Sequence, residues 1–67
     1  MKSVIKVGNM NNNEDVIKVR EAIANNEGVI ACEVDISKQE VNIVFDDTSI
    51  DIDKIIISIE EAGYSII

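Results

Sequence analysis

The chain has 67 residues, of which 13 are acidic and 6 basic, giving a net charge of −7. We expect a single domain over residues 1–67, and the absence of histidine excludes imidazole catalysis and any nucleophile paired with histidine. The acidity argues against nucleic acid as a partner, because phosphates would be repelled. There is no long apolar run and no signal peptide, which predicts a cytoplasmic protein without membrane insertion.

The first half of the chain predicts a strand followed by a helix. Residues 3–7 alternate in the manner of a strand, and Gly8 with Asn9 interrupts the pattern. Either Asn11 or Asn12 can cap a helix that runs to about Ala24, and Asn11 has capping-box spacing to Glu14. The predicted buried stripe of this helix consists of Val16, Val19 and Ile23.

The second half predicts a hairpin, a helix and a short last strand. Residues 29–36 and 41–45 alternate and are joined by a polar turn. Residues 51–62 carry apolar side chains at helical spacing, and residues 64–67 form the final strand. On the strand at 29–36, the side chains expected to face inward are Ile30, Cys32, Val34 and Ile36.

The resulting order of strands and helices is β-α-β-β-α-β. This order predicts an α+β ferredoxin-like fold, in which a four-stranded antiparallel sheet carries both helices on one face. The other face of the sheet should meet water, because it is mostly polar. Its expected residues are Val4, Lys6, Glu33, Asp35, Asn42, Val44 and Ile67.

Two runs of residues resemble a known family. Residues 7–15 read Val-Gly-Asn-Met-Asn-Asn-Asn-Glu-Asp, and residues 59–64 read Ile-Glu-Glu-Ala-Gly-Tyr. They resemble the heavy-metal-associated domain, the module of copper chaperones and of the N-terminal arms of metal-pumping P-type ATPases. Of the family's Val-x-Gly-Met-x-Cys-x-x-Cys, the first run keeps Val7 and Met10 and has Asn9 at the loop glycine, and the second run matches the family's Ile-Glu-x-x-Gly-Tyr. The resemblance covers the whole chain and implies the same fold.

The resemblance also implies that the metal-binding cysteines have been lost. Their positions fall on Asn12 and Asp15, whereas Met10 is retained and is expected to pack beneath the loop. Cu(I) prefers thiolates, while amide and carboxylate oxygens suit hard cations that require about six ligands. We therefore expect no bound metal and no cofactor. The alternative is a carrier of altered metal preference that uses the oxygens of Asn12, Asp15 and Glu14.

Each remaining feature has a structural interpretation beside a functional one. Cys32 is expected to be a small core residue and not a reactive thiol. Tyr64, near the loop in the family, is expected to close one end of the core or to shield Met10. Ile17 lies near the edge of the buried stripe of its helix and Ile57 lies off that of its own, and both are candidates for a partner surface.

Together these features predict a non-enzymatic member of the copper-chaperone and metal-transport family that acts as a protein-interaction module. No acid–base pair, phosphate loop or activated nucleophile is present in the sequence. The acidic surface would suit a protein partner with a basic face. It would equally keep the domain soluble, as a monomer or a weak homodimer.

Overall fold

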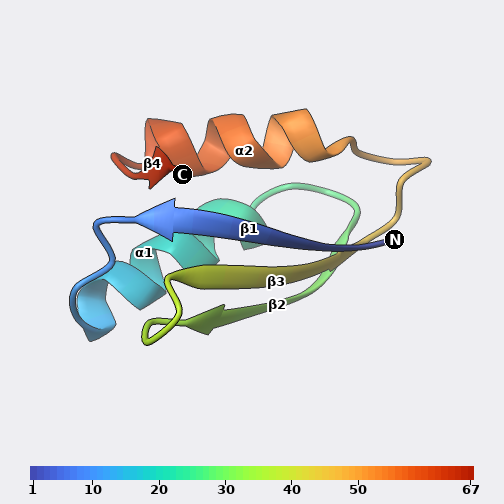
Figure 1. The fold of residues 1–67 in the computed structure, drawn as a ribbon. Helices are drawn as coiled ribbons and strands as arrows, with labels where there is room; N and C mark the ends of the chain where they lie inside the picture. Colours follow the sequence, from blue (N-terminus) through green and yellow to red (C-terminus); the bar gives the residue numbers. More distant parts are fainter.

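The structure, a computed structural model, describes residues 1–67 (Figure 1). Four strands and two helices follow one another in the predicted order. Their bounds are β1 Lys2–Gly8, α1 Asn13–Ala24, β2 Val29–Asp35, β3 Glu40–Phe45, α2 Ile52–Glu61 and β4 Ser65–Ile66. The prediction of the elements is therefore confirmed, with boundaries displaced by one or two residues.

The strands form one antiparallel sheet in the order β2-β3-β1-β4. β1 and β3 occupy the centre, and β4 pairs with β1 only at Val7 and Gly8. This arrangement is the ferredoxin-like α+β fold that the sequence predicts. Figure 1 shows both helices lying along the sheet, with the C-terminus beside the end of β1.

The core lies between the sheet and the helices. All 12 buried residues belong to one hydrophobic cluster, and none of them is charged. The buried side chains of β1 and β3 lie on one face of the sheet and pack in the same cluster as the buried side chains of both helices. Both helices therefore cover that face of the sheet. The fully buried side chains are Val7, Met10, Val19, Ile23, Val41, Ile43, Phe45, Ile55 and Ile59.

Side-chain oxygens cap the start of each helix. Asn12 caps α1 by accepting the N–H of Asp15, and Asp51 caps α2 by accepting the N–H of Lys54, both at 3.0 Å. Of the two caps that the sequence allowed, Asn12 is therefore the one that forms, and the capping-box pairing of Asn11 with Glu14 is not among the hydrogen bonds of the structure. Val16, predicted to be buried in the stripe of α1, is only half-buried because it lies in the first turn at the edge of the helix layer.

The prediction that Ile30 faces inward was wrong. Val29 pairs with Phe45 and Ala31 pairs with Val44, so Ile30 is an extra residue in a β-bulge. The bulge shifts the alternation of β2, and Ile30 is 70% exposed. Beyond the bulge the predicted parity holds, because Cys32, Val34 and Ile36 pack against the core.

No helix covers the second face of the sheet, which is mostly polar as predicted. Cross-strand pairing places three rows of side chains there, one of them made by Lys6, Glu40 and Asp35. The Lys6 ammonium lies 3.5 Å from the Glu40 carboxylate. Neither helix of the structure has the length and apolar character needed to cross a membrane.

Candidate functional site

The loop between β1 and α1 brings together the residues that the sequence marked as a site. It turns at Asn9, whose φ of 69° is left-handed, a conformation that asparagine tolerates better than most residues. The next side chain, Met10, points into the core and is 1% exposed. Met10 therefore packs beneath the loop as predicted, which leaves the polar residues that follow it at the surface.

Asn12 and Asp15 meet at the first turn of α1, and their oxygens accept hydrogen bonds from the protein itself. The Asn12 Oδ1 accepts the backbone N–H of Asp15. One oxygen of Asp15, Oδ2, accepts the N–H of Asn11 at 2.8 Å. The other, Oδ1, accepts the hydroxyl of Tyr64 at 2.6 Å, a contact between residues 49 positions apart in the chain. Each carboxylate oxygen thus accepts one hydrogen bond from within the fold.

The Asp15–Tyr64 hydrogen bond changes the acidity of both side chains. The hydroxyl of Tyr64, and then the N–H of Asn11, lower the pKa of Asp15 below its ordinary value, because they stabilise the carboxylate. The same bond, with burial of the ring, raises the pKa of Tyr64 to about 12. At neutral pH the pair therefore consists of an ionised acceptor and a protonated donor.

Tyr64 lies in the core, one of the two roles expected from the sequence, and also makes a contact that was not predicted. Its ring belongs to the core cluster and is 8% exposed. Its hydroxyl reaches past the core to the first turn of α1. The residue therefore closes one end of the core and holds the loop at the same time.

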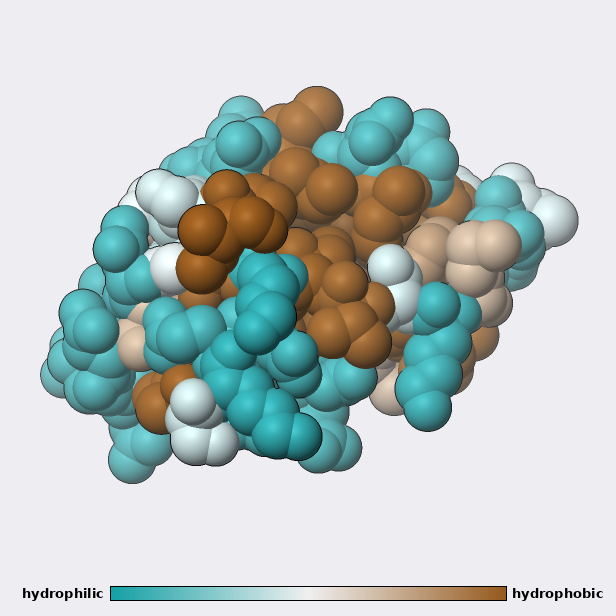
Figure 2. Space-filling view, in the orientation of Figure 1, coloured by the Kyte–Doolittle hydropathy of each residue, from teal (hydrophilic) through white to brown (hydrophobic).

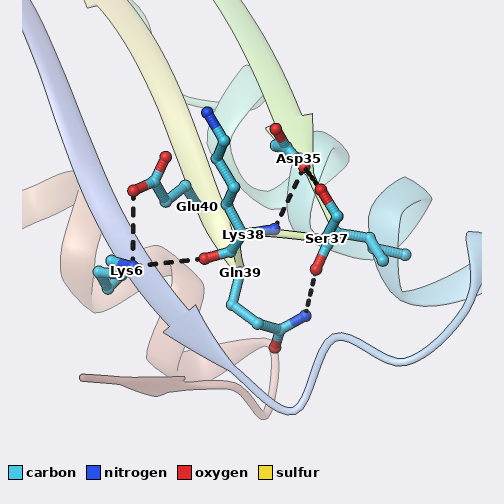
Figure 3. Close-up of polar contacts among 7 residues, drawn as sticks. Lys6, Asp35, Ser37, Lys38, Gln39 and Glu40 are labelled. Atoms are coloured by element: carbon cyan, nitrogen blue, oxygen red, sulfur yellow. Dashed lines mark hydrogen bonds and ion pairs between the residues drawn. The ribbon is translucent and has the colours of Figure 1, made fainter.

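Gln39, at the turn between β2 and β3, also holds the loop, and the sequence analysis missed it. Its amide nitrogen donates to the carbonyl oxygens of Met10 at 2.7 Å and Ile36 at 2.8 Å. Its amide oxygen accepts the N–H of Met10 at 3.2 Å. Figure 3 shows the Gln39 side chain leaving the turn, beside the contacts of Asp35 with Ser37 and Lys38.

Gln39 makes these contacts from a left-handed backbone conformation, with φ of 53°. In addition, its own carbonyl oxygen accepts the N–H of Val7 at 2.9 Å. The hydrogen bonds of the side-chain amide thus continue those between β1 and β3 into the loop. Hydrophobic periodicity in the sequence does not identify a residue of this kind, although a long polar side chain in a short turn suggests a contact with a neighbouring loop.

The other candidate residues lie away from the loop. Ile17 on α1 and Ile57 on α2 are both 52% exposed. Cys32 is half-buried in β2, and burial raises the pKa of its thiol. No three side chains among Cys, Asp and Glu are arranged to hold a metal ion.

Comparison with known proteins identifies the family. A sequence model described as the heavy-metal-associated domain matches residues 4–65. The chain belongs to the heavy-metal-associated domain family. Since Cys32 is its only cysteine, this family member has no Cys-x-x-Cys pair. No curated protein sequence matches the chain.

Solved structures of similar proteins share the fold over their full length. A CopZ metallochaperone has a TM-score of 0.97 at 22% identity, with 100% of both chains covered. Oxidized MerP from Ralstonia metallidurans CH34 has a TM-score of 0.92 at 26% identity, covering 98% of this chain and 94% of that one. Apo-CopP from Helicobacter pylori has a TM-score of 0.89 at 27% identity, with 100% of both chains covered.

Proposed function

We propose that this chain is a protein-interaction module of the heavy-metal-associated family that does not carry Cu(I). The observation behind the proposal is the hydrogen bonding of Asp15, at one of the positions where the resemblance puts a cysteine. Its two carboxylate oxygens accept from Tyr64 and Asn11, so the loop is held by internal contacts. A metal is then not required to order it.

The chemistry of the side chains supports this proposal. Cu(I) is a soft ion that binds thiolates, and the only thiol, Cys32, lies in β2 with its pKa raised by burial. Asn12 and Asp15 offer oxygens in place of sulfur. A copper ion would therefore find no pair of soft ligands at the loop.

The alternative, a carrier of a hard cation, would use Asn12, Asp15 and Glu14. Such ions take six or more oxygen ligands, and an ion at Asp15 would compete with the hydroxyl of Tyr64 at 2.6 Å. The side chains and backbone of this loop could supply only some of these oxygen ligands. The alternative is therefore weaker, although an ion titration tests it directly.

The proposed partner is another protein, and no catalytic role is proposed. The structural neighbours include a CopZ metallochaperone and a copper binding domain from HMA7, a P-type ATPase. With a net charge of −7, the chain would associate fastest with a domain that presents a basic face. We propose that the protein acts in the cytoplasm as a monomer or a weak homodimer.

Restoring both cysteines tests the proposal. The double variant Asn12→Cys, Asp15→Cys should gain Cu(I) binding in competition with a chelator, because we expect the backbone of the loop to keep the family's shape. The unchanged protein should show none, and the single variant Asn12→Cys provides the control for one added thiol. Tight Cu(I) binding by the unchanged protein, or a folded double variant that still fails to bind, would contradict the proposal.

A further inference from the structure

One edge of β1 is free over most of its length. β3 pairs with residues 2–6 on one side, whereas β4 pairs only with Val7 and Gly8 on the other. Beyond β4, the N–H of Ile67 donates to the carbonyl oxygen of Lys6 at 3.0 Å. No strand lies beside the remainder of this edge.

The hydrogen bonds of β1 show which backbone groups are free there. The amino group of Met1 donates to the Phe45 oxygen at 2.6 Å, and the N–H of Phe45 donates to the Met1 oxygen at 2.8 Å. Because successive residues of an antiparallel strand bond to opposite sides, odd-numbered residues of β1 bond to β3. The N–H and C=O groups of Lys2 and Val4 therefore point to the free edge.

Apolar side chains of α2 lie beside this edge. Ser58 accepts a hydrogen bond from Asn26 at the end of α1, so it marks the side of α2 that faces α1. Ile56 lies two residues earlier, about 200° around the helix, and is half-buried against the core with Ile52. Figure 2 shows hydrophobic atoms continuing from α2 towards β1. A strand added here would bury alternate side chains against this apolar strip.

The charge of β1 differs from that of the rest of the molecule. Its only charged residues are Lys2 and Lys6, in a chain whose net charge is −7. Val4, between the two lysines, is 54% exposed. The opposite edge of the sheet, β2, carries a bulge, which interrupts the regular spacing that an added strand would need. The regular and basic edge is therefore that of β1.

We propose that the free edge of β1 binds an extended segment of a partner protein as an added antiparallel strand in line with β4. The backbone of Lys2 and Val4 would supply the hydrogen bonds. The segment would place apolar residues opposite Ser3 and Ile5, on the side of Ile52 and Ile56, and an acidic residue opposite Lys2. It would contain no proline, because each bonded position needs its N–H.

This inference rests on the protein-binding role proposed above and adds the chemistry of the partner. Its test uses no metal, so its failure is distinguishable from a failure of the metal-free proposal. The probe is the peptide acetyl-Val-Thr-Val-Glu-Val-amide, added to the isotopically labelled 67-residue protein. The readout is hydrogen exchange of individual backbone amides by NMR.

In the free protein the amides of Lys2 and Val4 should exchange fast, while those of Ser3 and Ile5 are protected by β3. Saturating probe should slow exchange at Lys2 and Val4 at least about tenfold, the effect of about 1.4 kcal/mol. The variant Val4→Pro removes one edge N–H without removing a bond to β3, and should weaken binding of the probe about tenfold. Replacing Lys2 by glutamate should also weaken binding, and a probe with lysine in place of its glutamate should restore it.

Three results would overturn the proposal. The first is slow exchange of Lys2 and Val4 in the free protein at low concentration, since the edge would then already be covered. The second is protection that grows with protein concentration alone, which would show that a second copy occupies the edge. The third is the absence of an effect specific to the edge, seen either as unchanged exchange at millimolar probe or as the same probe affinity in the Lys2→Glu variant.

Discussion

The side chain of Asp15 illustrates how one substitution can change what a loop does. The resemblance places a cysteine here, whose thiolate would be a soft ligand and whose sulfur is a weaker hydrogen-bond acceptor than a carboxylate oxygen. A carboxylate accepts up to four, and two donors of the fold, the Asn11 N–H and the Tyr64 hydroxyl, lie within reach. The same position thereby becomes a structural contact between α1 and Tyr64, which lies between α2 and β4.

Titration of Tyr64 tests this contact. It is the only tyrosine, and there is no tryptophan, so the absorbance of tyrosinate reports one group. Because Asp15 raises its pKa to about 12, the midpoint should lie near pH 12 in the folded protein and fall in the variant Asp15→Asn. Circular dichroism at each pH verifies that the fold persists, and a midpoint at the ordinary value of 10.0 in folded protein would contradict the contact.

The same shift fixes how stability depends on alkaline pH. A pKa that is higher in the folded state means that folding favours the protonated hydroxyl. The contribution of the contact is therefore complete below pH 10.0 and is lost as the pH rises towards about 12. For Asp15 the sign is opposite: its pKa is lowered on folding, so its contribution is present at neutral pH and is lost in acid.

At the scale of elements, the turn between β2 and β3 supports the loop that precedes α1. The Gln39 amide makes three hydrogen bonds, two of them to the backbone of Met10. The loop is thus held from two sides, by Gln39 at its start and by the Asp15–Tyr64 pair at its end. These contacts explain how a loop without metal can keep a defined shape.

Replacing Gln39 by alanine should lower the free energy of unfolding by about 1 to 3 kcal/mol, because buried backbone groups of Met10 lose their partner. Urea unfolding measures the loss, and hydrogen exchange at Met10 should speed up. The neighbouring change Lys38→Ala is the control and should stay within about 0.5 kcal/mol. Equal stability of the two variants would show that the amide does not support the loop.

The bulge in β2 leads to a prediction about how much Ile30 contributes to stability. Ile30 is 70% exposed whereas Ile43, on the adjacent strand, is 0% exposed. We therefore expect Ile30→Ala to change the free energy of unfolding by less than about 0.5 kcal/mol, and Ile43→Ala to lower it by about 2 to 5 kcal/mol. Chemical denaturation of both variants checks this. A large loss at Ile30 would place its side chain in the core and remove the bulge.

At the scale of the whole molecule, much of the fold could be predicted from periodicity. The apolar stripe of α2 identified the helix and the face that it buries, which contains Ile55 and Ile59. The alternation of apolar residues in β3 identified the strand and its buried face, which contains Val41, Ile43 and Phe45. The order of those elements then left few arrangements of the sheet. The same reasoning failed at Ile30, because a bulge shifts the alternation and leaves no mark on composition.

The site was only partly predictable. The resemblance drew attention to Asn12, Asp15, Met10 and Tyr64, and capping rules assigned a role to the asparagine. The contacts of Tyr64 with Asp15 and of Gln39 with Met10 join residues 49 and 29 positions apart. Such contacts depend on how the elements pack, and no local pattern in the sequence encodes them.

The central claim is that the oxygens of Asn12 and Asp15 serve the fold and not an ion. The amide signals of Asn11 and Asp15 test it most directly, because these two N–H groups donate to the side chains in question. We predict that titration with Cu(I), Zn²⁺, Ca²⁺ or Mn²⁺ leaves both signals unchanged at micromolar free ion. A saturable change with a dissociation constant below about 1 micromolar for any of these ions would contradict the account.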